Sequence, residues 1–125
     1  MSTTPQLQSF IAGRWIGSEA AQTLRSAING QPVARTHAEA IDFGEALDFA
    51  RGTGLPGLMA LNFQQRAARL KALAKYLNER KEQLYTISAH TGATRNDSWI
   101  DIEGGTGTLF AYASMGSAEL PSSNV

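Results

Sequence analysis

The sequence predicts an α+β fold, in which a small antiparallel β-hairpin element precedes about four helices. Short apolar runs separated by turn residues fill the first third of the chain. Apolar residues spaced three and four positions apart fill the remainder. With 125 residues, the chain is long enough for one hydrophobic core. Its composition, with 42% hydrophobic and 18% charged residues, excludes disorder along the whole length.

Two turns are expected in the β element, at Ala12-Gly13 and at Asn29-Gly30. Asn-Gly between short apolar runs is a strong hairpin signal, because both residues tolerate positive φ. Pro32 fits the beginning of a strand, where the missing backbone N–H of proline is tolerated. The runs expected as strand arms are 7–11, 14–16, 23–28 and 33–36.

The first two helices are expected on either side of a glycine-rich run. Asp42 precedes the first helix, and the run 52–57 (GTGLPG) is expected to end it. Asn62 is expected to open the second helix, since Gln65 follows it at the spacing of a capping box. The apolar faces of these two helices consist of Phe43, Ala46, Leu47 and Ala50, and of Ala67, Leu70, Leu73, Ala74 and Leu77.

A third helix is expected after a solvent-facing break at 78–81. Leu84, Ile87 and Ser88 share one side of this helix. Gly92 is a plausible residue just past its end, because glycine readily adopts the left-handed conformation found there. This conformational role accounts for Gly92 without a catalytic or binding function.

The last helix is expected to begin at Asn96 or Asp97, either of which can act as an N-cap. Its two large aromatic residues, Trp99 and Phe110, are expected to anchor the core. A glycine inside a helix costs about 1 kcal/mol relative to alanine. The last helix contains three such glycines, Gly104, Gly105 and Gly107. They predict that another backbone packs closely against this helix.

The charge balance and the absence of cysteine exclude several classes of function. Eleven basic residues offset eleven acidic ones, so the chain has no overall positive field to hold nucleic acid. The basic residues between 66 and 81 fit the solvated face of a helix. No cysteine is present to form a disulfide, a thiolate metal site or a nucleophile. No signal peptide and no membrane segment are apparent, so a cytoplasmic location is expected.

The run Gly105-Thr106-Gly107 invites comparison with a dinucleotide-binding fingerprint. That fingerprint needs a third small residue, where this chain has Phe110, and it must follow a strand. Helix packing is therefore favoured for these glycines. The two histidines, His37 and His90, lack further residues at metal-ligand spacing, so neither is expected to bind metal or act in catalysis.

Three acidic residues, Asp97, Asp101 and Glu103, form a small group near the start of the last helix. A general acid and base pair is conceivable. A position near the positive end of the helix dipole is the favoured explanation, above all for Asp97. Residue types alone leave a Ser-His-Asp arrangement open, but no Gly-x-Ser-x-Gly elbow is present to expose a nucleophile. No catalytic, cofactor-binding or metal-binding residue is therefore predicted in this chain.

Several motifs, taken in order, resemble the N-terminal segment of the aldehyde dehydrogenase superfamily. FIAGRWI at 10–16 resembles the family's opening FINGxW hairpin, and NGQPV at 29–33 loosely resembles its NPATGE turn. QRAARLKALA at 65–74 closely resembles the ERAxxLxxxA helix. TGATRNDSWIDIEGGTGTLFAYAS at 91–114 closely resembles the bifunctional aldehyde dehydrogenase and enoyl-CoA hydratase enzymes of phenylacetate degradation. The semialdehyde dehydrogenases of benzoyl-CoA degradation share much of that segment.

This resemblance implies a larger parent enzyme that oxidises a CoA-linked semialdehyde with NADP or NAD. In the family a cysteine attacks the aldehyde and a glutamate activates water to release the acid. These residues, the oxyanion asparagine and the nucleotide-binding strands are expected beyond residue 125. The chain alone is therefore expected to be inactive and to bind no cofactor.

The resemblance also implies an organisation and partners. Residues 1–6 are expected to be a flexible N-terminus, 7–120 the family segment of an α/β enzyme, and 121–125 a truncated linker. The expected partners are the remainder of the parent enzyme and further copies in a homo-oligomer, with no nucleic acid and no membrane. The alternative is a non-catalytic interaction module that docks a partner through the glycine-bearing face of its last helix.

Overall fold

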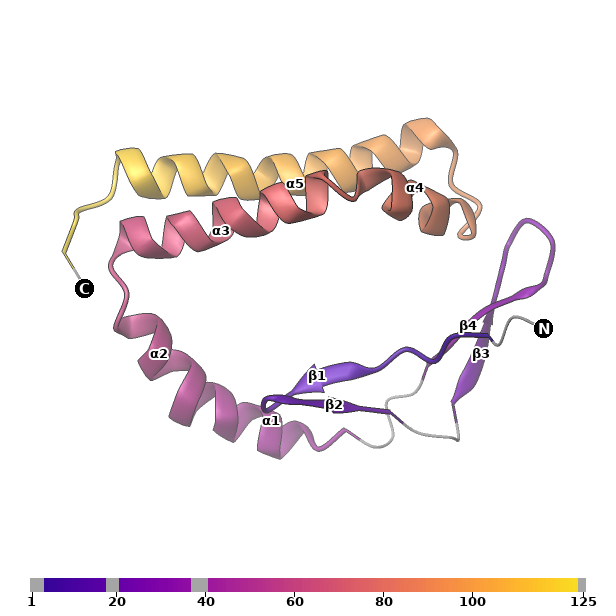
Figure 1. Cartoon of the computed structure of the whole chain (residues 1–125), viewed down its shortest axis with the longest axis horizontal. Coiled ribbons are helices and arrows are strands. Elements are labelled where there is room, and N and C mark those ends of the chain that lie inside the picture. The colour runs from indigo at the N-terminus through magenta and orange to yellow at the C-terminus, as the bar shows by residue number, and fades with distance from the viewer. Residues whose placement is uncertain (1–3, 18–20, 37–40, 124–125) are drawn as a thin grey trace. The chain divides into compact units, whose positions relative to one another are not determined.

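A computed structural model of the chain describes residues 4–17, 21–36 and 41–123 (Figure 1). The chain divides into two compact units. The first comprises Met1–Leu55 with His90–Gly92, and the second comprises Pro56–Ala89 with Ala93–Val125. Two antiparallel hairpins lie in the first unit, and three long helices make up most of the second. The α+β class predicted from the sequence is confirmed.

The first hairpin joins β1 (Ser9–Ile11) to β2 (Arg14–Ile16). The turn residues Ala12 and Gly13 both have positive φ, 50° and 79°. Two successive residues with positive φ form the turn whose twist matches that of paired strands. The turn expected here is confirmed.

The second hairpin joins β3 (Gln22–Arg25) to β4 (Pro32–Thr36). Pro32 opens β4, as expected for a residue without a backbone N–H. The extended N-terminal segment pairs with the other side of β4, where the Leu7 N–H donates to the Arg35 carbonyl at 2.8 Å.

The connection in the second hairpin is longer than the sequence predicted. The strand expected over 23–28 ends at Arg25 instead. Ser26 leaves the ladder because its N–H donates to the Gln31 carbonyl at 2.9 Å and its carbonyl accepts from Gly30 at 2.8 Å. A six-residue turn over 26–31 therefore replaces the two-residue turn. Gly30 does have positive φ, as expected.

The helical segment after the strands does not end at the run 52–57, contrary to prediction. The chain stays helical through a π turn, in which the Leu55 N–H donates to the Ala50 carbonyl. In a regular α-helix the ring of Pro56 would collide with the carbonyl four residues earlier, at Gly52. A wider π turn relieves such a collision. The segment consists of α1 (Phe43–Phe49), the π-helix η1 (Ala50–Gly54) and α2 (Leu55–Met59).

Two N-caps expected from the sequence are confirmed. The Asp42 carboxylate accepts a hydrogen bond from the Glu45 N–H at 3.0 Å, at the start of α1. Asn62 and Gln65 form a reciprocal capping box, with both hydrogen bonds at 2.9 Å, before α3 (Phe63–Asn78). Local sequence thus sets where both helices begin.

The break expected near 78–81 separates α3 from α4 (Lys81–Ala89). After α4 the chain turns, and Gly92 adopts a φ of 88°. A side chain is strained at this φ, so the conformational role expected for Gly92 is confirmed.

The long helix α5 (Arg95–Ala118) begins with a different cap from those expected. Thr94 is the N-cap, and its Oγ1 accepts from the Asp97 N–H at 3.2 Å. Asp97 lies three residues further on and bonds back to the Thr94 N–H at 3.2 Å. The expected caps Asn96 and Asp97 already belong to the first turn, because the capping box places the boundary two residues earlier.

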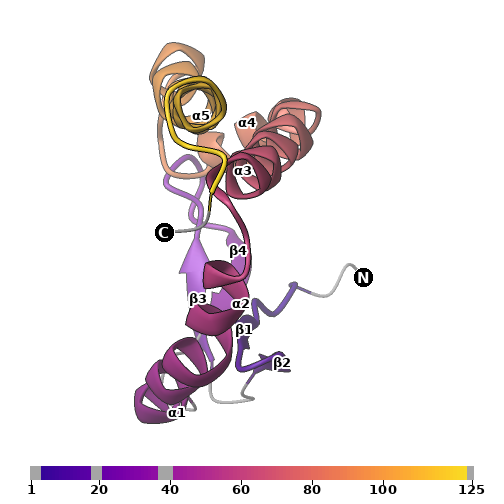
Figure 2. The same cartoon turned by 90° about the vertical axis from the view of Figure 1, so that its left-hand side faces the viewer.

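α5 runs antiparallel alongside α3, with α4 packed near its first half (Figures 1 and 2). Small side chains fill the contact between α3 and α5, here called the α3–α5 seam. A Cβ added to Gly116 would lie 3.2 Å from the Cβ of Ala67, so the two helices approach closely there. The buried seam residues are Ala67, Ala74, Thr106, Ala113 and Gly116.

The expected packing of the mid-helix glycines is not found within the described residues. A Cβ added at any of the three positions would meet no atom within 4 Å. Trp99 is 54% exposed and Phe110 is only partly buried, so the expected anchoring role is wrong for Trp99. None of the three glycines, Gly104, Gly105 and Gly107, lies at a close contact with another described helix.

Candidate functional site

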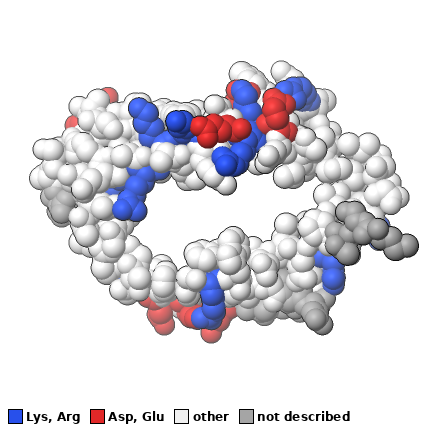
Figure 3. Space-filling model, viewed as in Figure 1, with Lys and Arg blue, Asp and Glu red and all other residues white. Residues whose placement is uncertain are grey.

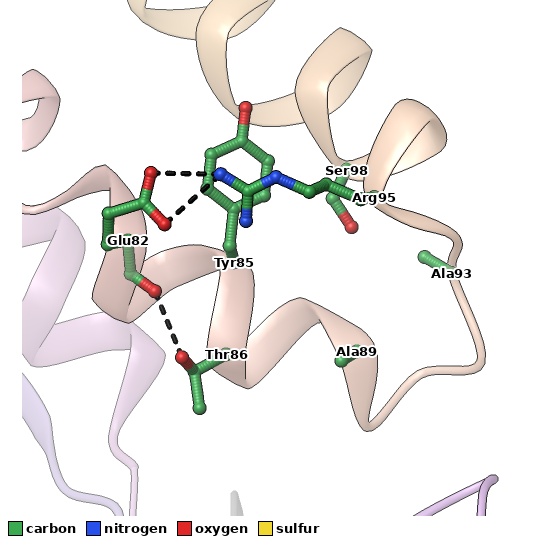
Figure 4. Close-up of a pocket in the computed structure, with 7 residues that line it drawn as sticks. All are labelled: Glu82, Tyr85, Thr86, Ala89, Ala93, Arg95 and Ser98. Atoms are coloured by element: carbon green, nitrogen blue, oxygen red, sulfur yellow. Dashed lines mark hydrogen bonds and ion pairs between the residues drawn. The ribbon is translucent and has the colours of Figure 1, made fainter.

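A cluster of ionisable side chains joins α4 to the first half of α5 and is called the α4–α5 polar cluster. It lies beside a cavity of about 260 Å³ (Figure 4). The short turn between the two helices brings their side chains together. Its members are Lys81, Glu82, Tyr85, Arg95 and Glu103.

Arg95 bridges the two helices in this cluster. Its Nη2 donates to both carboxylate oxygens of Glu82, at 3.0 and 3.1 Å. Its guanidinium carbon lies 4.2 Å from the centre of the Tyr85 ring, and Figure 4 shows the group in front of that ring. The hydrogen bonds that Arg95 donates to Glu82 raise the pKa of Arg95. Charge pairing and stacking therefore hold the start of α5 against α4.

Glu103 receives two hydrogen bonds from α4. The Tyr85 hydroxyl donates to its Oε1 at 2.7 Å, and the Lys81 ammonium donates to its Oε2 at 3.1 Å. These two bonds, the one from Tyr85 first, hold the pKa of Glu103 below its usual value. The same hydrogen bond, with help from burial, raises the pKa of Tyr85 from 10.0 to about 12.

These protonation preferences do not suit catalysis near neutral pH. A carboxylate with a lowered pKa is a weaker general base, and a tyrosine with a raised pKa is a poorer nucleophile. Both oxygens of Glu103 already accept hydrogen bonds. The arrangement instead pairs each charge across two helices. The cluster is therefore suited to holding α4 and α5 together.

A pair of hydroxyls extends this contact away from the charges. The Oγ atoms of Ser88 and Ser98 lie 2.8 Å apart, and Ser98 is only 1% exposed. A buried hydroxyl needs such a partner, because an unpaired one loses its hydrogen bonds to water. The serine pair thus joins the two helices at a buried point of contact.

The acidic residues named from the sequence occupy three different places. Asp97 completes the capping box of α5, and its hydrogen bonds from Thr94 lower its pKa. Glu103 belongs to the α4–α5 polar cluster. Asp101 is exposed and lies at the edge of an apolar groove. The structure does not bring them together as an acid and base pair, and the helix-start role expected for Asp97 is confirmed.

The histidines divide between the described and the undescribed parts of the chain. His37 lies outside the described residues. The Nδ1 of His90 lies 3.1 Å from the Oγ of Ser26, and its carbonyl accepts from the Ala27 N–H at 2.8 Å. His90 thus contacts the turn of the second hairpin. No group of three metal-ligating side chains is found among the described residues.

Gly105, Thr106 and Gly107 lie inside α5, where their backbone N–H groups belong to the helix ladder. Such groups are not free to bind a pyrophosphate, unlike those at a helix start. The Thr106 hydroxyl donates to the Ile102 carbonyl at 2.9 Å. This run therefore does not form a nucleotide cradle.

Sequence reasoning missed the partnership within the α4–α5 polar cluster. The sequence predicts a solvent-facing break at Lys81 and no role for Glu82, Tyr85 or Arg95. One available signal is the three-residue spacing of Glu82 and Tyr85, which places both on the same helical face. The cross-helix partners depend on the geometry of the intervening turn, which spacing does not give.

A second hollow, here called the α4–α5 groove, is mainly apolar and has a volume of about 330 Å³. Asp101 is the single charged side chain among the described residues that line it. Charged side chains of both signs lie over α3, α4 and the start of α5, whereas the C-terminal half of α5 is mostly uncharged (Figure 3). The groove is lined by Leu77, Leu84, Ile87, Ser88, Asp101, Ile102, Gly105, Thr106 and Leu109.

Among residues 4–17, 21–36 and 41–123, no helix combines the length and the apolar character that a membrane span requires.

Comparison with known proteins identifies a family and a relative. Residues 15–124 match the aldehyde dehydrogenase family. A 3,4-dehydroadipyl-CoA semialdehyde dehydrogenase of Aromatoleum evansii is 34% identical over 115 residues. The aligned region covers 90% of this chain but only 22% of that relative.

Proposed function

Because the chain belongs to the aldehyde dehydrogenase family, we propose that it is the N-terminal segment of an enzyme that oxidises a CoA-linked semialdehyde to its acid. The 34% identity to an acyl-CoA semialdehyde dehydrogenase supports the substrate class. NAD or NADP is the proposed hydride acceptor. The enzyme is proposed to be a cytoplasmic homo-oligomer.

The proposed role of these 125 residues is structural support. The sequence contains no cysteine, so it supplies no thiolate to attack an aldehyde. The Gly105-Thr106-Gly107 run does not fit a nicotinamide nucleotide, since it lies within a helix. The paired charges of the α4–α5 polar cluster stabilise helix packing. Catalysis and cofactor binding are therefore assigned to the rest of the enzyme.

A chimera tests whether the chain acts as such a segment. The aligned region of the Aromatoleum evansii enzyme is replaced by this chain, and NAD(P)H formation is measured with that enzyme's semialdehyde. The chimera is expected to be active, while the 125-residue chain alone is expected to be inactive. Activity of the isolated, purified chain would contradict the structural role. A folded but inactive chimera would contradict the proposed placement.

Two types of semialdehyde are proposed as the substrate of the enzyme. Segment 91–114 resembles the bifunctional phenylacetate enzymes, which carry an enoyl-CoA hydratase part as well. The Aromatoleum evansii relative instead favours a 3,4-dehydroadipyl-CoA semialdehyde type of substrate. Expression of the complete coding frame, followed by assays with both semialdehydes and both nucleotides, separates them. A hydratase activity in the same polypeptide would favour the phenylacetate type.

A second candidate function is a non-catalytic interaction module. The open space around Gly104, Gly105 and Gly107 favours it, because a partner backbone can approach there. The isolated chain should then self-associate or capture a partner through α5. Sedimentation over a range of concentrations tests this, and a monomer at every concentration would count against self-association.

A further inference from the structure

The α4–α5 groove has an apolar floor that the described residues leave uncovered. Ile87 lines it and is 61% exposed, although isoleucine is commonly buried. On α5, no charged residue occurs between Glu103 and Glu119. A helix segment without charged residues on any side lacks the polar face typical of a helix that is covered on one side only. The described helices cover only the side that faces α3 and α4.

Asp101 places a negative charge at the edge of the groove. Its carboxylate is exposed at the edge and has no hydrogen-bond or ion-pair partner among residues 4–17, 21–36 and 41–123. The other acidic members of this region, Glu82 and Glu103, are paired with Arg95 and Lys81. Any segment that covers the α4–α5 groove therefore meets the negative charge of Asp101 beside an apolar surface. A basic side chain next to apolar ones is the complementary chemistry.

We propose that the α4–α5 groove docks an apolar segment bearing a lysine or arginine, supplied by the part of the same enzyme that lies outside the aligned region. The inference rests on the proposed function. The Aromatoleum evansii relative has 78% of its length beyond the 22% that aligns, which provides ample chain for such a segment. The cation pairs with Asp101 while the apolar side chains cover Ile87.

Cysteine labelling tests the apolar part of this contact. The chain has no native cysteine, so Ile87→Cys introduces a unique thiol into this segment. A maleimide should label it in the isolated chain, and this labelling should be lost in the chimera described above. Peptide mass identifies the labelled site, and unfolding the same chimera in urea should restore labelling. Equal labelling of the folded chimera and the isolated chain would overturn the proposal.

A charge reversal tests the cationic part. Asp101→Lys in the Ile87→Cys chimera should restore labelling, because two cations would then face each other. Asp101→Glu should keep the thiol protected, and Asp48→Lys on α1 is the matched reversal outside the groove. Continued protection in Asp101→Lys would show that no cation meets this carboxylate.

Two outcomes separate this inference from competing explanations. Protection that appears in the isolated chain as its concentration rises would identify a second copy as the occupant and overturn the proposal. An inactive chimera would count against the proposed function. An active chimera whose Ile87→Cys thiol stays reactive would overturn only the docking inference.

Discussion

The two ends of α5 contact their neighbours by different means. At the α3–α5 seam, small residues such as Ala74 and Gly116 allow the helices to approach closely, and the buried residues described there are uncharged. At the α4–α5 polar cluster, Arg95 and Glu103 pair with opposite charges and a tyrosine hydroxyl across the contact. The comparison shows that one helix can combine tight steric packing with polar pairing along its length. The two regions should therefore respond differently to changes in volume, charge and pH.

The largest expected effect is steric and falls on the seam. Ala74 is 0% exposed, so Ala74→Leu forces a larger side chain between α3 and α5. Overpacking of this kind typically costs about 1–3 kcal/mol. Urea denaturation of the 125-residue chain should show the loss. Ala72→Leu on the exposed side of α3 is the control, and an equal effect in both variants would contradict tight packing at the seam.

The N-cap of α5 offers a smaller test at the polar end. Thr94→Ala removes the side chain that caps the helix, and a lost cap typically costs about 1 kcal/mol. Asn96→Ala should have little effect, because Asn96 already lies within the first turn. The two denaturation midpoints provide the measurement. A larger loss for the Asn96 variant would place the cap where sequence alone suggested it.

Glycine substitutions separate the seam from the open face of the same helix. Gly107→Ala should stabilise the 125-residue chain by up to about 1 kcal/mol, since alanine favours the helix and nothing obstructs its Cβ. Gly116→Ala should gain less, because its Cβ would lie 3.2 Å from that of Ala67. Similar increases in stability from both substitutions would mean that α3 and α5 can shift apart at the seam at little energetic cost. A loss for Gly107→Ala in the chimera would reveal close packing there in the whole enzyme.

The smallest expected effect concerns pH at the polar cluster. The pKa of Tyr85 is raised above its unfolded value of 10.0, so its contribution to stability is present below pH 10 and lost as the pH rises toward about 12. The pKa of Glu103 is lowered, so its contribution is present above its ordinary value of 4.5 and lost as the pH falls through the lowered one.

Tyr85→Phe should remove the alkaline dependence and weaken the acidic one, because the phenyl ring cannot donate to Glu103. Denaturation midpoints across the pH range provide the measurement. Tyr112→Phe is the control, since Tyr112 is largely exposed. An unchanged alkaline profile in the Tyr85 variant would show that its hydroxyl does not stabilise the contact.

Local sequence signals predicted most element boundaries that depend on neighbouring residues. The capping box at Asn62 and Gln65 and the turn at Ala12-Gly13 are examples, because their hydrogen bonds and backbone angles arise within a few positions. The π turn before Pro56 was missed, since a proline after glycines usually ends a helix. The Thr94 cap was also missed, because Asn96 and Asp97 are equally good capping types.

Sequence by itself determined the α+β class, the succession of hairpins and helices, the resemblance to aldehyde dehydrogenases and the lack of a cysteine nucleophile. These follow from periodicity, turn chemistry and residue content, which are local or compositional. Tertiary structure alone decided that Gly116, rather than Gly104, Gly105 or Gly107, lies at a close helix contact. It also decided that Arg95 meets Glu82, because the turn between α4 and α5 sets which helical faces meet.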